Sequence, residues 1–137
     1  MKKQKILSKL TALATLVSVV GAMSVSTFAY SSNQWSINSN PHIPSIYNKL
    51  TDYASIPYVS AGYRVNCTSY TGESGSYIKV TSSSAGGINK PGGYVLITSS
   101  GYTQPWTMNG SSTTNVTFTL TARFGYMVTA SGTIESV

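Results

Sequence analysis

Apolar and polar residues alternate most clearly near the carboxyl end of the chain, from Ser112 to Ala122. Every second position there is apolar, at Val116, Phe118, Leu120 and Ala122, and threonines lie between them. Side chains of a strand point to opposite faces with a period of two. The pattern therefore predicts a half-buried β-strand with an apolar inner face and a hydroxyl outer face.

The same alternation predicts how the chain continues after this strand. A three-residue loop of residues 123–125 would place Leu120 opposite Val128 in a hairpin, with the apolar residues of both strands on one side. A two-residue loop would turn Val128 to the solvent face. We therefore expect the three-residue hairpin, with Arg123 and Phe124 at its tip.

The connection before the strand has two interpretations, and they decide the role of Trp106. A three-residue loop of residues 108–110 pairs Tyr102 with Val116 and places the indole of Trp106 on the inner side. A two-residue turn at Asn109 and Gly110 is a common hairpin signal and would turn the indole to the other face. Trp106 is a core residue in the first case, which parity favours, and a binding-surface residue in the second.

Short alternating segments recur about every 10 residues along the rest of the chain, separated by glycine, proline and serine turns. They cover residues 33–38, 63–70, 76–82, 93–98 and 100–107. Residues 45–54 have helical spacing instead, and flanking prolines limit them to a short helix or an ordered loop. Together the segments predict an all-β fold, an antiparallel β-sandwich or small barrel of about seven short strands.

The first 29 residues have the three-part plan of a secretory signal peptide. Four lysines precede an apolar run from Leu10 to Met23, and small residues predict cleavage between Ala29 and Tyr30. The apolar run is shorter than the roughly 20 residues that a membrane-spanning helix needs. We therefore expect a signal helix that is removed, no membrane span after cleavage, and a secreted protein of bacterial type whose residues 30–137 form a single β-sandwich domain.

Removal of this leader changes the charge balance. The full chain has nine basic and three acidic residues, but four of the nine lie in the leader, so five against three remain, a net charge of +2. No basic run with interleaved aromatic residues is present after the leader, which argues against nucleic acid as a partner. The few remaining charges leave sheet edges poorly guarded, so self-association is an alternative.

His42 and Cys67 are the only histidine and cysteine of the chain and hence the candidates for nucleophilic catalysis. The order His42, Cys67, Arg123 is similar to that in cysteine transpeptidases of bacterial cell envelopes, although the motif around their cysteine is absent here. The alternating segment around Cys67 favours a small core residue, and His42 lies in a turn between two prolines. One histidine, one cysteine and three scattered carboxylates form no metal site, and we expect neither a metal nor a cofactor.

Aromatic residues are the remaining candidates for a binding site. Trp35 and Trp106 could form a stacking platform for sugar rings, or pack in the core. Phe124, beside Arg123 at the predicted tip, is the one aromatic residue that we expect to be exposed, because a loop tip rarely buries a ring. Trp35, Trp106, Arg123 and Phe124 are therefore the candidate binding residues.

These features favour a secreted, non-catalytic protein that acts by surface contact with an extracellular protein, a glycan polymer or a cell-envelope component. One alternative is a bacteriocin-like toxin or a secreted enzyme inhibitor that inserts either the tip with Arg123 and Phe124 or the hairpin with Trp106 into its target. Another is a small envelope-acting enzyme that uses Cys67 and His42.

Overall fold

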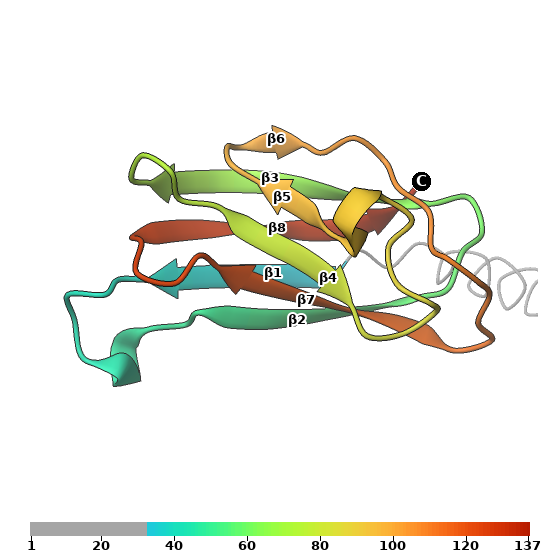
Figure 1. Ribbon diagram of the computed structural model, residues 1–137, viewed down its shortest axis with the longest axis horizontal. Helices are drawn as coiled ribbons and strands as arrows, with labels where there is room; N and C mark the ends of the chain where they lie inside the picture. The colour runs from blue at the N-terminus through green and yellow to red at the C-terminus, as the bar shows by residue number, and fades with distance from the viewer. Residues whose placement is uncertain (1–32) are drawn as a thin grey trace, which may run out of the picture. The chain divides into compact units, whose positions relative to one another are not determined.

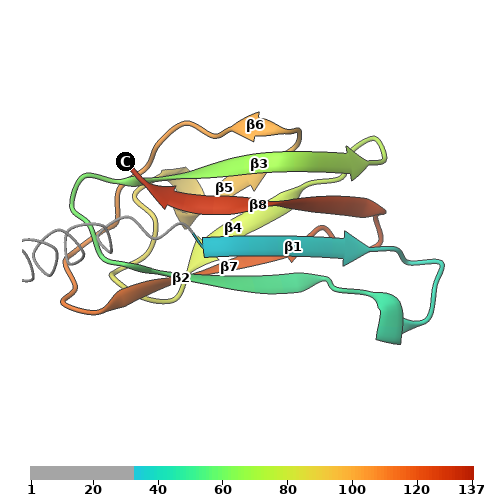
Figure 2. The same ribbon diagram turned by 180° about the vertical axis from the view of Figure 1, so that it is seen from behind.

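The computed structural model describes residues 33–137, so the predicted signal peptide and its cleavage site lie outside the described residues. These residues form two four-stranded antiparallel sheets (Figure 1, Figure 2). In spatial order, the first sheet contains β1 (Asn33–Ser39), β8 (Val128–Ser136), β3 (Tyr63–Gly72) and β6 (Gly101–Tyr102). The second contains β2 (Thr51–Pro57), β7 (Asn115–Ala122), β4 (Ile78–Ser82) and β5 (Val95–Ile97). The all-β sandwich predicted from the alternation is confirmed.

The described residues contain very little helix. Two single 3₁₀ turns are present, η2 (Ser45–Tyr47) and η3 (Pro91–Gly93). Each of the segments predicted as strands contains a strand, and β2 adds one that the alternation did not predict.

β2 occupies residues 51–54 of the segment 45–54, for which a short helix or an ordered loop was expected, so the helix prediction is wrong beyond η2. The strand pairs with β7 along its whole length, from Thr51 opposite Thr121 to Pro57 opposite Asn115. This pairing satisfies backbone groups continuously, whereas an isolated helix of two or three turns is marginal in water. Its inner face is small, because only Ala54 and Ile56 of β2 are buried.

The predicted hairpin through residues 123–125 is also wrong, because β7 and β8 belong to different sheets. Phe118 of β7 and Val128 of β8 are both buried, as the alternation requires. They reach the core from opposite sheets, and β8 pairs with β1 and β3. Alternation separates inner from outer faces, but the inner faces of a sandwich point at each other, so it cannot tell a hairpin from a crossing between sheets.

The pairing predicted for Tyr102 is wrong for a related reason. β6 lies in the first sheet, where Tyr102 is opposite Asn66 of β3, and the phenol ring is 60% exposed. Trp106 follows beside the same strand, and its backbone exchanges hydrogen bonds of 2.9 and 2.8 Å with Tyr63.

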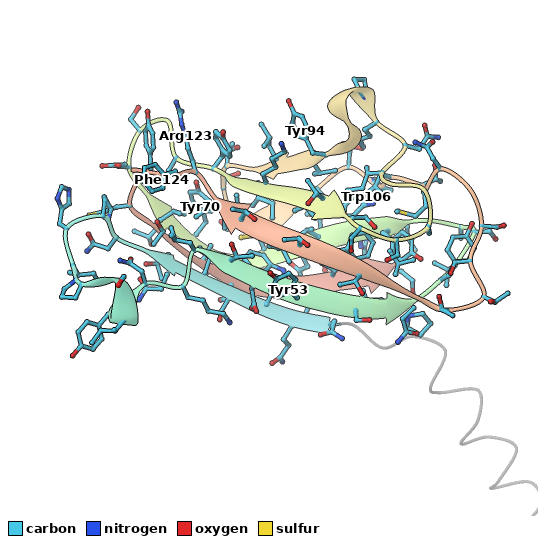
Figure 3. The ribbon with its side chains drawn as sticks, turned by 60° about the horizontal axis from the view of Figure 1, so that its bottom comes forward. Tyr53, Tyr70, Tyr94, Trp106, Arg123 and Phe124 are labelled. Atoms are coloured by element: carbon cyan, nitrogen blue, oxygen red, sulfur yellow. The ribbon has the colours of Figure 1, made fainter. Side chains whose placement is uncertain are left out.

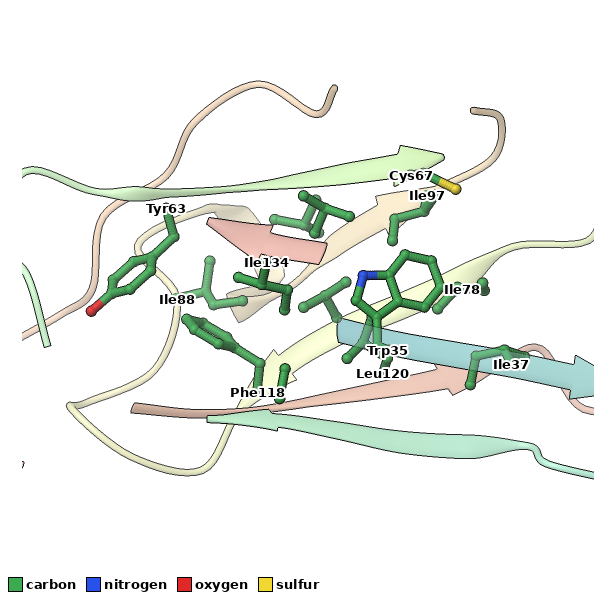
Figure 4. Close-up of a cluster of buried hydrophobic side chains, with 14 of the residues drawn as sticks. Trp35, Ile37, Tyr63, Cys67, Ile78, Ile88, Ile97, Phe118, Leu120 and Ile134 are labelled. Atoms are coloured by element: carbon green, nitrogen blue, oxygen red, sulfur yellow. The ribbon is translucent and has the colours of Figure 1, made fainter. Parts of the chain in front are cut away.

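One hydrophobic core fills the space between the sheets (Figure 4). At one point it is aromatic: the ring of Phe118 meets those of Tyr63 and Trp106 edge to face, at centroid distances of 5.0 and 5.8 Å. Such pairs contribute roughly 0.5–1.5 kcal/mol beyond the area they bury. The hydroxyl of Tyr63 accepts the backbone N–H of Val59 at 2.9 Å, and burial raises the pKa of this phenol.

The central strands of the first sheet pass unusually close together at Gly132 of β8. A Cβ atom at this position would collide with the carbonyl oxygen of Asn66 and lie 3.0 Å from the Cα atom of Cys67, both on β3. The register of β3 against β8 shifts directly afterwards, between Cys67 and Ser69. Glycine therefore permits the bulged pairing of these strands.

The two sides of the sandwich differ in how their edge strands are covered. On one side β1 and β2 cover each other: Asn38 and Lys49 exchange two backbone hydrogen bonds of 3.0 and 2.7 Å. In addition, the backbone N–H of Ser36 donates to Oδ2 of Asp52 at 2.7 Å. On the other side the outermost strands are the short β5 and β6. We call these the closed side and the open side.

Candidate functional site

The structure places the predicted site residues in two different environments. Trp35 and Trp106 are each only 3% exposed and lie in the core, so the interpretation of these indoles as a surface platform is corrected. Their inner positions follow from the alternation of β1 and from the bridge between Trp106 and Tyr63. Arg123 and Phe124 lie together at one end of the sandwich (Figure 3).

Three connections meet at this end, and we call them together the loop end: residues 40–50, residues 73–77 and residues 123–127. The hydroxyl of Ser39, the last residue of β1, donates to the carbonyl of Tyr126 at 2.9 Å, which ties the start of the first connection to the third. Glu73 ties the second to the third, because its N–H donates to the Met127 carbonyl at 3.1 Å. Its side chain also accepts the Met127 N–H at 2.9 Å. The three connections therefore form one bonded unit.

Arg123 acts as a clamp inside the loop end. Its backbone N–H donates to the carbonyl of Tyr77 at 2.9 Å, and Nη1 donates to the carbonyl of Gly75 at 2.8 Å. The guanidinium carbon lies 4.0 Å from the ring centroid of Tyr126 and 5.3 Å from that of Tyr77. Cation–π contacts of this kind contribute roughly 0.5–1 kcal/mol at exposed sites. The guanidinium therefore holds the loop in place rather than projecting a free charge.

Phe124, the next residue, is 88% exposed. Ile46 on η2 is 80% exposed, and further exposed apolar side chains of the loop end are those of Tyr47, Leu50 and Met127. Leaving a phenylalanine ring in water forgoes roughly 1.5–3 kcal/mol of burial energy. A group of exposed apolar side chains on a fixed scaffold is typical of a contact surface.

A preformed apolar hollow of about 280 Å³ lies beside Phe124. Its apolar lining comes from Pro41, Ile43, Leu50 and Phe124. The side chain of Asn48 closes the loop under it: Oδ1 accepts the N–H of Asn40 at 2.5 Å and Nδ2 donates to the carbonyl of Ile43 at 3.2 Å. An apolar group of a partner could enter this hollow without reorganising the loop.

A second hollow, of about 580 Å³, lies elsewhere, over the outer face of the first sheet, and is polar. Hydroxyl and amide side chains line it, including Gln34, Ser36 and Thr133. Its only charged residues, Lys49 and Asp52, form an ion pair of 2.8 Å. This hollow offers neither an exposed ring nor a free charge, so the loop end is the stronger candidate.

The residues considered for catalysis are placed unfavourably for it. Cys67 is 1% exposed, its Sγ contacts the carbonyl of Ser69 at 3.3 Å, and burial raises the pKa of the thiol. Nucleophilic cysteines need an accessible thiolate with a lowered pKa. His42 lies in an exposed turn, where its backbone N–H donates to Oδ1 of Asn40 at 2.9 Å. No group of three or more metal-ligating side chains occurs within residues 33–137.

Sequence reasoning found Arg123 and Phe124 but missed the rest of the loop end. Ile46, Tyr47 and Leu50 were predicted to lie in a short helix or an ordered loop, and nothing in the sequence joined that segment to residues 123–127. The exposure of Met127 could not be predicted, because residues 123–127 were interpreted as part of a hairpin and not as a connection between the two sheets.

Within residues 33–137, no helix has the length and hydropathy needed to cross a membrane. Comparisons of the chain with protein families, with curated proteins and with solved structures found no match.

Proposed function

We propose that the protein is a secreted, non-catalytic β-sandwich that acts by surface contact, and that the loop end is its contact surface. The observation that carries this proposal is the exposure of Phe124 on a connection held by Arg123 and Glu73. A loop whose backbone is already held in place loses little conformational entropy on binding. Protruding aromatic residues are common binding hot spots.

The surroundings of Phe124 indicate what such a partner must offer. The ring and the hollow beside it are apolar, whereas Arg123 and Glu73 are already engaged within the loop end. The matching surface is therefore an apolar recess or ridge with few charges, on an extracellular protein or a cell-envelope component. A glycan polymer could engage only the rings of Phe124 and Tyr47 there, because the tryptophans are buried.

The test compares Phe124→Ser with Tyr53→Ser, which removes another exposed ring from the outer face of β2. Retention of the purified mature protein is measured on intact bacterial cells, on isolated cell walls and on secreted proteins. We expect Phe124→Ser to weaken retention roughly tenfold or more, as for a hot spot. Both variants should unfold within about 0.5 kcal/mol of the wild type, since neither ring is packed. Loss of retention in Tyr53→Ser alone would contradict the proposal.

A second candidate function, a secreted inhibitor or toxin, is favoured by the way the Phe124 ring projects from a bonded loop. A single projecting side chain suits insertion into the pocket of a target enzyme. Inhibition of an extracellular enzyme, or dye leakage from neighbouring cells, that disappears in Phe124→Ser and persists in Tyr53→Ser would identify this function.

A further inference from the structure

The open side of the sandwich carries a second surface, separate from the loop end. A hollow of about 390 Å³ lies there, and its lining runs from Lys90 through β5 and β6 to Gln104. Tyr102 and Leu96 are exposed beside it. The closed side differs, because Asn38 of β1 bonds there to Lys49, just before β2, and Ser36 bonds to the side chain of Asp52. The two strands that end their sheets on the open side thus share one groove.

Positive charge gathers around this groove. Lys90 lines it, and Nζ of Lys79 lies 4.6 Å from the ring centroid of Tyr94, another lining residue. Arg64 lies with its guanidinium carbon 4.3 Å from the ring centroid of Tyr102, and it pairs with Glu135 at 3.2 Å. Neither lysine forms an ion pair within residues 33–137, and no carboxylate lines the groove.

This charge distinguishes between possible occupants. A second copy of the chain paired edge to edge would bring Lys79 and Lys90 close to their own counterparts, and like charges across an edge are unfavourable. An acidic occupant would gain from the same lysines. Because β5 has a neighbouring strand on one side only, an extended peptide has backbone groups to pair with.

We propose that the open side binds an acidic peptide segment in extended conformation, which adds to the second sheet as a strand beside β5. Alternate side chains of such a strand point to opposite faces. One set would lie over the groove near Tyr102, and the other would present carboxylates to Lys79 on the outer face. The site does not depend on the loop end, so the two proposals can fail separately.

The test uses a short fluorescent peptide of alternating threonine and glutamate, with fluorescence anisotropy as the measurement. Control peptides replace glutamate by lysine, or place proline at the centre, which removes a donor needed for strand pairing. Inorganic polyphosphate serves as a competitor without a peptide backbone. Hydrogen exchange of the β5 amides reports whether the peptide pairs with this strand.

We expect saturable binding of the acidic peptide, slower exchange at Leu96 and its neighbours, and no binding of the lysine or proline peptides. The double variant Lys79→Gln, Lys90→Gln should weaken binding by roughly two- to thirtyfold, the range expected for two exposed ion pairs. Phe124→Ser should bind the peptide like the wild type.

Three results would overturn the proposal. Equal binding of the proline peptide, or full displacement by polyphosphate without any change in β5 exchange, would show general attraction of anions. Absence of peptide binding, with self-association of the Lys79→Gln, Lys90→Gln variant in sedimentation, would show that the lysines only guard an edge.

Discussion

Asp52 joins the two sheets on the closed side, and replacing it tests how much that link stabilises the fold. The carboxylate belongs to β2, accepts the N–H of Ser36 on β1 at 2.7 Å, and lies 2.8 Å from Nζ of Lys49. Burial raises the pKa of Asp52, but the hydrogen bonds from Lys49, Ser36 and Tyr53 and the charge of Lys49 lower it more. The net result is a pKa below the ordinary 3.8.

The expected loss of stability follows from the strength of the contacts that Asp52 makes. Asp52 is 19% exposed and Lys49 is 48% exposed, so the ion pair itself contributes only about 0.2–1 kcal/mol. A hydrogen bond to a charged group contributes about 1.5–3 kcal/mol, and one between neutral groups about 0.5–1.5 kcal/mol. Asp52→Asn keeps an acceptor oxygen and should cost about 1 kcal/mol. Asp52→Ala leaves the Ser36 N–H without this acceptor and should cost about 2 kcal/mol.

Urea unfolding at neutral pH and at about pH 2 measures both the cost and its origin. Because the folded pKa lies below the unfolded value, the carboxylate stabilises the fold above the unfolded pKa, and this contribution is lost as the pH falls through the folded pKa. The difference between wild type and Asp52→Asn should therefore shrink in acid. Lys49→Met serves as the control, because it removes the ion pair with Asp52 but keeps the hydrogen bond from the Ser36 N–H to the Asp52 carboxylate. A difference that is absent at neutral pH, or unchanged in acid, would refute the reasoning.

Two further predictions concern the first sheet. Gly132→Ala should destabilise the protein by about 2–4 kcal/mol, because the new methyl group meets the backbone of Asn66 rather than a side chain that can move; wild-type stability in urea would contradict this. Cys67 should react with a thiol reagent only as fast as the protein opens, because the thiol is buried. The Cys67→Ala variant should keep the retention measured for the wild type. Rapid modification of the folded protein, or lost retention in a folded variant, would favour the catalytic interpretation.

The sequence allowed the faces of most strands to be predicted, because apolar residues occupy every second position of β7 without interruption and the other strands show shorter stretches of the same alternation. Which strands pair with each other could not be predicted in the same way. Phe118 and Val128 point to the core equally well if their strands form one hairpin or if the strands lie in opposite sheets. Only the pairing of all the strands decides between these two arrangements. β2 was missed because its inner face holds only Ala54 and Ile56, too little apolar volume to outweigh the helical spacing before it.

The candidate site was predictable only as far as it depends on one connection. The exposure of Phe124 was predicted because the residue lies beside a glycine in the loop that follows a clearly predicted strand, where few side chains can cover the ring. Ile46 and Tyr47 could not be joined to it, since they lie far away in the sequence and reach the same end because β1 pairs with β8, where Ser39 bonds to Tyr126. The burial of Trp106 likewise depends on Tyr63, a residue of another strand.

The strand order also determines when the protein can fold. Among the strands of residues 33–137, only β4 and β5 are both consecutive and paired, and the first of these strands, β1, pairs with the last, β8. Nearly all strand pairing is therefore of high contact order, which predicts folding on the millisecond to second scale. The first sheet cannot be completed on a nascent chain before β8 has been synthesised. A fragment that ends before Val128 should therefore lack the strand that joins β1 to β3.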